Sequence, residues 1–176
     1  MFLSRLFGER KMTTLAAGTA APDFTLPAMD GKQFSLREAL TRGPVILAFF
    51  KVSCPVCQFA LPFIERIYKA HGDGNATIAG VSQNDRKETT AFVKEYGLTF
   101  PMLLDDTKTY PVSNAYGLTN VPTVFWIAQD GSIEISSVGW LRSDIDEINL
   151  RAAQTTDATL VPVFRSDEDV PDFRAG

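Results

Sequence analysis

An apolar run followed at once by the chain's two cysteines constrains the fold most strongly. Residues 45–50 read Val-Ile-Leu-Ala-Phe-Phe, without polar residues at alternate positions. Such a run is typical of a parallel strand that is buried on both faces. Pro55 lies just beyond it and suits the first turn of a helix, because it has no N–H group to leave unsatisfied there. The sequence therefore predicts a buried strand, a short loop and a helix that begins near Cys54.

Cys54 and Cys57 form a Cys-Pro-Val-Cys motif at the expected start of this helix. Free backbone N–H groups and the helix dipole favour an anion there, and therefore the thiolate, which is the reactive form of a cysteine. Cys57 lies about one turn further along the same face, from which a disulfide with Cys54 can close. This spacing after a strand indicates a redox motif; the structural alternative is a pair of inert buried cysteines.

Length and composition limit the classes of protein to consider. The chain has 176 residues and is 45% apolar, enough for one domain with a full core. A net charge of −4 argues against a nucleic-acid partner, and two cysteines cannot form a secreted disulfide framework. We find no apolar stretch long enough for a transmembrane helix, and residues 1–11 lack the apolar core of a signal peptide. We therefore expect a cytoplasmic protein.

The remaining segments alternate between expected strands and helices, which predicts a mixed α/β sheet with helices on both sides. They are a hairpin over 22–36, a short helix over 36–41 capped by Ser35, a strand over 77–81, a helix over 86–96 closed by Gly97, an extended piece over 100–104, a short helix over 110–116, strands over 121–128 and 133–138, and a last helix capped by Ser143 and ending near Gln154.

Three regions are expected along the chain. Residues 1–19 form an N-terminal extension, 20–155 the folded domain, and 156–176 a C-terminal tail that lies over the surface or is disordered. Met12 is a plausible alternative start, and residues 1–11 could be a loose extension or a weak amphipathic membrane contact.

Taken together, these motifs resemble the thioredoxin superfamily, and more narrowly the TlpA-like and ResA-like thiol-disulfide oxidoreductases of the AhpC/TSA redoxin group. The similarity spans about residues 20–154. It rests on Pro22-Asp23-Phe24-Thr25-Leu26, Asp30-Gly31, the strand leading into the cysteine pair, Pro62, Val121-Pro122-Thr123 and Asp130-Gly131. The resemblance implies a thioredoxin-like three-layer α/β sandwich, with a central mixed sheet, an N-terminal β-hairpin and one inserted βα unit.

The resemblance also implies roles for five residues. Cys54 would attack, and Cys57 would resolve the mixed disulfide. Pro55, Val121 and Pro122 would line the substrate-binding surface, with a cis peptide bond before Pro122 and the Val121 backbone turned towards an extended substrate. The expected partners are protein thiols or disulfides and an upstream electron donor, for a monomer or weak dimer. No cofactor is expected beyond the Cys54–Cys57 redox disulfide, and no metal.

Three positions depart from the family pattern. Ala48 stands where thioredoxins carry a buried aspartate, and Ala60 where many TlpA-like proteins carry a glutamate. Ser53 replaces the aromatic residue that usually precedes the first cysteine. Both usual proton acceptors are therefore missing, and the base would be Lys51, water or the substrate. A plain surface lysine is the alternative for Lys51.

Three other functions stay open from the sequence. A peroxiredoxin-like thiol peroxidase shares the framework, but Leu47 and Lys51 stand where its Pro-x-x-x-Thr-x-x-Cys loop has proline and threonine. Paired thiolates could instead handle Cu(I) or Zn(II). The only histidine, His71, is expected to be a solvent-exposed spectator. Trp140 is the one aromatic residue that an adaptor function could use, although core packing is the favoured interpretation.

Overall fold

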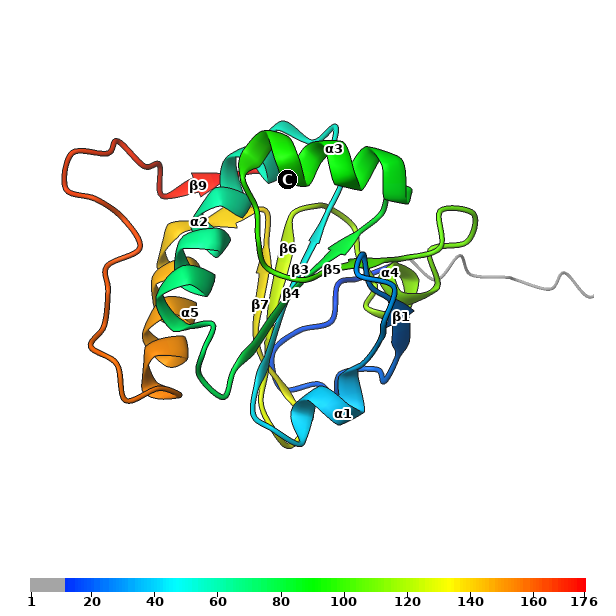
Figure 1. Cartoon of the computed structure of the whole chain (residues 1–176), viewed down its shortest axis with the longest axis horizontal. Coiled ribbons are helices and arrows are strands. Elements are labelled where there is room, and N and C mark those ends of the chain that lie inside the picture. The colour runs from blue at the N-terminus through cyan, green and yellow to red at the C-terminus, as the bar shows by residue number, and fades with distance from the viewer. Residues whose placement is uncertain (1–11) are drawn as a thin grey trace, which may run out of the picture.

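A five-stranded mixed sheet forms the centre of the computed structural model, which describes residues 12–176 (Figure 1). The strand order is β5-β4-β3-β6-β7, in which β3, β4 and β5 run parallel and β6 and β7 are antiparallel to their neighbours. The bounds are β3 (Val45–Phe50), β4 (Thr77–Ser82), β5 (Met102–Leu104), β6 (Thr123–Ile127) and β7 (Ile133–Val138). The predicted mixed α/β sheet is confirmed.

The central strand β3 is buried along its whole length, as its apolar run predicts. Its neighbours are β4 on one side and β6 on the other. Alternate side chains enter two separate hydrophobic clusters on the two faces of the sheet. One cluster takes Ile46, Ala48 and Phe50, and the other takes Val45, Leu47 and Phe49. Burial on both faces therefore fixes the position at which β3 ends and the cysteine motif begins.

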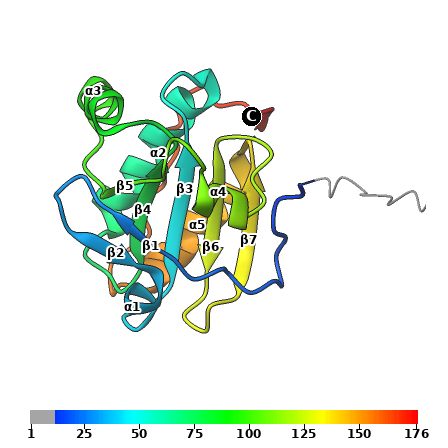
Figure 2. The same cartoon turned by 90° about the vertical axis from the view of Figure 1, so that its right-hand side faces the viewer.

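Helices and a hairpin cover the two faces of the sheet (Figure 2). Helices α2 and α5 pack against each other on one face, and Phe92 of α3 joins their cluster. The N-terminal hairpin, α1 and α4 lie on the other face. The bounds are β1 (Thr25–Pro27), β2 (Gln33–Ser35), α1 (Leu36–Leu40), α2 (Pro55–His71), α3 (Arg86–Tyr96), α4 (Pro111–Ala115) and α5 (Arg142–Gln154). The caps predicted at Ser35 and Gly97 are confirmed.

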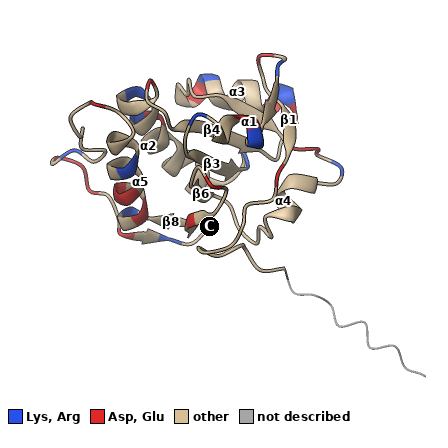
Figure 3. Ribbon diagram, turned by 90° about the horizontal axis from the view of Figure 1, so that it is seen from below, with Lys and Arg blue, Asp and Glu red and all other residues tan. Residues whose placement is uncertain are grey.

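The charged residues lie mainly on the helices and loops (Figure 3). Glu134 in β7 is the only charged residue in the five strands of the central sheet. No helix among residues 12–176 is long and apolar enough to cross a membrane. The expectations for residues 1–11, a loose extension or a membrane contact, lie outside the described residues.

Two local expectations were wrong. Ser143 does not cap α5, which begins two residues earlier than expected, at Arg142, with Leu141 at the N-cap and no side-chain cap. His71 is not an exposed loop residue. It is the last residue of α2 and is 1% exposed, and burial lowers its pKa. Trp140 is fully buried, so its predicted core packing is confirmed.

The C-terminal tail, residues 156–176, lies over the surface beside α2 and α5 (Figure 1). Val163 and Val170 are buried in the cluster that those helices share. A short strand, β9 (Phe173–Arg174), pairs antiparallel with β8 (Trp140–Leu141). The C-terminus consequently lies at the same end of the sheet as the carboxyl end of β3 (Figure 2).

Candidate active site

Cys54 is the N-cap residue of α2, with an extended backbone at φ −84° and ψ 116°. Its sulfur accepts a hydrogen bond from the backbone N–H of Cys57 at 3.1 Å. This is one of the N–H groups that the start of a helix leaves without an intrahelical partner. The side chain is partly exposed. The position therefore gives Cys54 both access to a partner and a backbone hydrogen-bond donor at its sulfur.

Cys57 has the opposite environment. Its side chain is fully buried in the cluster beneath α2. Burial raises its pKa strongly, and a hydrogen bond with the Cys54 side chain raises it further. Both thiols are free in this structure. The pair thus combines one partly exposed sulfur with one that is buried.

The Val121–Pro122 peptide bond is cis, as the resemblance implies. The Cys54 thiol donates to the Val121 carbonyl oxygen at 3.4 Å. The loop is held in place by Thr123, whose hydroxyl donates to the Asn120 carbonyl at 2.8 Å, and by the Gly139 N–H, which donates to the Pro122 carbonyl at 2.8 Å. The structure thus brings Cys54, Cys57 and Val121 together, with Pro122 buried behind them and Pro55 exposed at the first turn of α2.

Two amide side chains that the sequence interpretation missed support the loop before Cys54. The Asn84 side-chain oxygen accepts from the Val52 N–H at 3.0 Å, and the Gln58 amide donates to the Val52 carbonyl at 2.9 Å. Asn84 also donates to Glu88 in the first turn of α3. The only sequence signal for Asn84 is its place just before that helix, where polar residues are common for other reasons.

The structure gives Cys57 no replacement for the missing carboxylates. Ala48, in β3, and Ala60, in α2, are both buried. Two carboxylates are buried in the described part of the chain, Glu65 and Asp105. Glu65 accepts from the Thr99 and Phe100 N–H groups, and Asp105 accepts from Val112 and Ser113 at the start of α4. Both carboxylates therefore stabilise backbone turns.

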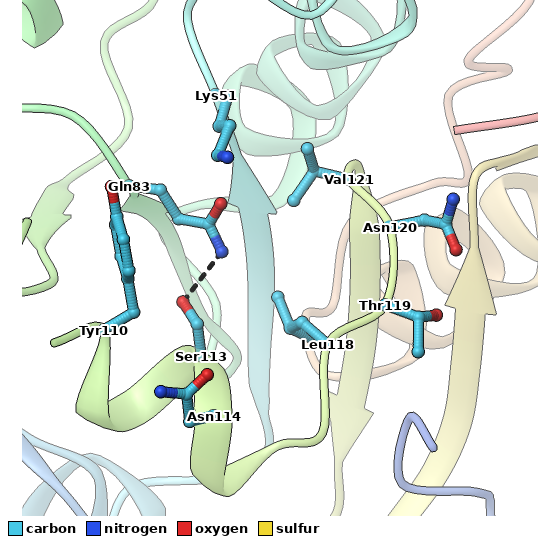
Figure 4. A pocket seen from close by; sticks show the side chains of 9 residues that line it. All are labelled: Lys51, Gln83, Tyr110, Ser113, Asn114, Leu118, Thr119, Asn120 and Val121. Carbon is cyan, nitrogen blue, oxygen red and sulfur yellow. Dashed lines mark hydrogen bonds between the residues drawn. The ribbon is translucent and has the colours of Figure 1, made fainter. Parts of the chain in front are cut away.

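A cavity of about 220 Å³ lies beside the Val121–Pro122 loop (Figure 4). Val121, whose carbonyl faces Cys54, forms part of its wall. The other lining residues are Lys51, Gln83, Tyr110, Ser113, Asn114, Leu118, Thr119 and Asn120. We call it the side cavity.

His71 cannot join the two thiols as a ligand. It lies fourteen residues beyond Cys57 on one helix, which corresponds to about 21 Å at about 1.5 Å per residue. Within residues 12–176, no group of three or more His, Cys, Asp and Glu side chains is placed to hold a metal ion.

The AhpC/TSA family model matches residues 17–136. The chain belongs to this family. Within the family it is ResA-like: the thiol-disulfide oxidoreductase ResA of Halalkalibacterium halodurans is 34% identical over 133 residues, which cover 75% of this chain and 73% of that protein. ResA of Geobacillus thermodenitrificans is 31% identical and covers 69% of each chain.

A solved structure adds to this assignment. A thiol:disulfide interchange protein of the thioredoxin family from Chlorobium tepidum superimposes with a TM-score of 0.64 at 27% identity, over 76% of this chain and 95% of that one. The AhpC/TSA fold of the chain is therefore the thioredoxin-like α/β sandwich, as the motifs implied. The chain is a thiol-disulfide oxidoreductase.

Proposed function

We propose that the protein exchanges disulfides with other proteins, and that Cys54 attacks while Cys57 resolves. The observation that carries this assignment is the asymmetry of the pair. The Cys54 sulfur is accessible at the start of α2 and accepts the Cys57 N–H, whereas the Cys57 thiol is buried and its pKa is raised. A thiolate is the attacking species in thiol–disulfide exchange, so the accessible, stabilised sulfur acts first.

The exchange has two steps in the reductive direction. The Cys54 thiolate forms a bond to one sulfur of the substrate disulfide, and the other substrate sulfur leaves as a thiolate that takes up a proton. The Cys57 thiol then loses its proton and attacks the Cys54 sulfur, and the second substrate sulfur leaves. The substrate gains two electrons and becomes a dithiol, while the protein becomes the Cys54–Cys57 disulfide. An upstream dithiol donor then reduces the Cys54–Cys57 disulfide back to two thiols.

The Val121 backbone supports the same assignment. Its carbonyl oxygen lies 3.4 Å from the Cys54 sulfur, where an extended substrate chain can pair with the loop while its disulfide meets Cys54. Pro122 and Pro55 border this surface, one behind the loop and one at the helix start. Protein disulfides are therefore the proposed substrates.

A trapping experiment tests the order of the two cysteines. In Cys57→Ser the second step is blocked, so a mixed disulfide between Cys54 and insulin should accumulate and be visible by mass spectrometry. In Cys54→Ser exchange should fall to the uncatalysed rate. Equal trapping through Cys57 in Cys54→Ser would reverse the assigned roles, and no adduct in either variant would contradict the function. A reduction potential near about −270 mV would favour a reductase, and one above about −180 mV an oxidase or isomerase.

A further inference from the structure

The side cavity shares Val121 with the cysteine site, and the two exchange steps leave it unused. Its wall brings together parts of the chain that are far apart in sequence: the loop after β3, the end of β4, α4 with the residue before it, and the segment before β6 (Figure 4). At about 220 Å³ it has room for roughly one amino-acid side chain. Val121 belongs both to this wall and to the cysteine site, so the cavity and the site share one residue of the loop before Pro122.

Lys51 is the only charged residue among those that line the cavity. Its side chain is exposed, and its ammonium lies 5.9 Å from the centroid of the Tyr110 ring. Within residues 12–176 it forms no ion pair with a carboxylate. The C-terminal carboxylate of Gly176 instead accepts from the Asn120 side-chain amide at 2.9 Å. The cavity therefore offers one cation to an incoming group and no anion.

A chain of hydrogen bonds holds the floor of the cavity. The Gln83 amide donates to the Ser113 hydroxyl at 2.9 Å, and that hydroxyl donates to Asp105 at 2.7 Å. Ser113 and Asp105 are each 2% exposed, so this arrangement is fixed inside the fold. Gln83 uses its N–H on the protein, and its side-chain oxygen remains the group that it offers to a ligand (Figure 4). The lining therefore presents an ammonium beside a fixed hydrogen-bond acceptor.

Tyr110 adds an independent observation. Its backbone is left-handed, at φ 47° and ψ 51°, and it is the only residue other than glycine among residues 12–176 with a positive φ. Such a conformation is unfavourable for a bulky side chain and persists where the surroundings hold it. Here it places the ring against Lys51. The ring that faces the lysine thus belongs to a residue that the backbone holds in an uncommon conformation.

We propose that the side cavity is a subsite for a carboxylate on the disulfide substrate, with Lys51 as the residue that recognises it. The Gln83 side-chain oxygen accepts an N–H group of the same substrate. The substrate class is a disulfide that carries an acidic group near the reacting sulfur, either an acidic peptide segment or a small anionic disulfide. This inference rests on the function proposed above, because it assigns the substrate of the same site.

The kinetic experiment compares three small disulfides of different charge. Reduced protein is mixed with glutathione disulfide, hydroxyethyl disulfide or cystamine, which are anionic, neutral and cationic, and the loss of free thiol is followed by stopped flow. Lys51→Gln should lower the rate ratio of the anionic to the neutral disulfide about fivefold, the size expected of a partly exposed ion pair. Lys51→Arg should retain most of the ratio. Lys32→Gln, which removes an exposed charge in the turn between β1 and β2, is the matched control and should leave the ratio unchanged.

A binding experiment separates this inference from the redox function. S-methylglutathione, and an acidic peptide with S-methylcysteine next to aspartate, cannot exchange disulfides. Each is titrated into the protein while the side-chain amide signal of Gln83 is followed by NMR. A saturable shift that is lost in Lys51→Gln supports the subsite even if exchange fails. A shift with S-methylglutathione alone indicates a small-molecule source of the carboxylate, and a shift with the peptide alone indicates a protein source.

Two results would overturn the subsite. One is an equal loss of rate in Lys51→Gln with all three disulfides, because Lys51 would then act on the Cys54 thiolate alone. The other is the absence of any Gln83 shift with both ligands. If the wild-type protein reacted with no disulfide while the Gln83 shift was still seen, the proposed function would fail and the subsite would stand.

Discussion

The Val121–Pro122 loop separates two regions that are filled in different ways. On one side, which we call the tail flank, Trp140, Leu141 and Phe59 are covered by residues 170–176 of the chain itself. On the other side lies the side cavity, lined by Lys51 and uncharged side chains. In the tail flank, residues 170–176 make the backbone pairing and the aromatic contacts. In the side cavity, the polar side chains face a space that the chain does not fill. A substrate that reaches Cys54 therefore meets a surface covered by the chain's own tail on one side and the side cavity on the other.

The largest expected effect comes from removing the aromatic centre of the tail flank. Trp140 is fully buried, its ring contacts Phe59 and Phe63 at centroid distances of 4.9 and 5.0 Å, and its N–H donates to the Pro171 carbonyl at 2.7 Å. Trp140→Ala should lower the free energy of unfolding by about 3–5 kcal/mol. Leu118→Ala, in the wall of the cavity, should cost about 1–2 kcal/mol because Leu118 is already partly exposed.

Urea unfolding followed by circular dichroism measures both variants. Equal losses of stability would show that the two flanks are packed alike, which would contradict the comparison.

A smaller effect is expected from one glycine that lies under the tail. Gly139 has φ +76°, and a Cβ added there would lie 2.7 Å from the Arg174 carbonyl oxygen. Gly97 also has a positive φ, +63°, but a Cβ there would meet nothing within 4 Å. Each change to alanine should cost about 1–2 kcal/mol for the left-handed backbone. Only Gly139→Ala should also displace β9, because the clash is with backbone.

Hydrogen exchange at the amides of β8 and β9 measures this displacement. Faster exchange there in Gly139→Ala, with protection unchanged in Gly97→Ala, is the expected result. The same protection in both variants would mean that the tail does not depend on close contact at Gly139.

The central elements could be predicted from sequence because local patterns and tertiary packing agree there. The run over 45–50 is apolar at every position, and both faces of β3 are buried. Pro55 at the first helical turn and Gly97 at the end of α3 are residues whose backbone preferences match the positions that they occupy. The cysteine motif was recognisable for the same reason, since the strand that precedes it and the helix that it begins are its neighbours in sequence.

The two flanks could not be predicted, because they depend on contacts between distant segments. Phe173 and Arg174 form a strand only by pairing with β8, and two residues carry no periodicity. The left-handed backbone of Tyr110 has no signal in a residue type that normally avoids it. His71 directly precedes the glycine-rich residues 72–74 in sequence but is buried by the folded chain. Positions of this kind depend on contacts between distant segments, which local sequence patterns do not encode.

The smallest effect concerns the ion pair that holds the middle of the tail. The Arg66 guanidinium donates to both carboxylate oxygens of Glu168, and this pairing lowers the pKa of Glu168 from 4.5 to about 2. Because the folded pKa is below the unfolded one, the pair stabilises the docked tail above about pH 4.5, and this contribution is lost as pH falls towards about 2. Both side chains remain partly open to water, so the contribution is small.

Glu168→Gln should therefore weaken docking of the tail already at neutral pH and should remove the part of the acid transition that Glu168 causes. The NMR shift of the Trp140 indole N–H, which donates to Pro171 in the tail, reports on docking between pH 7 and 2.5. Glu147→Gln is the matched control, because it removes an ion pair of α5 with Arg151 that does not touch the tail. If Glu147→Gln changed the indole signal as much as Glu168→Gln, the tail would respond to general charge, and its docking would not depend on the Arg66 contact.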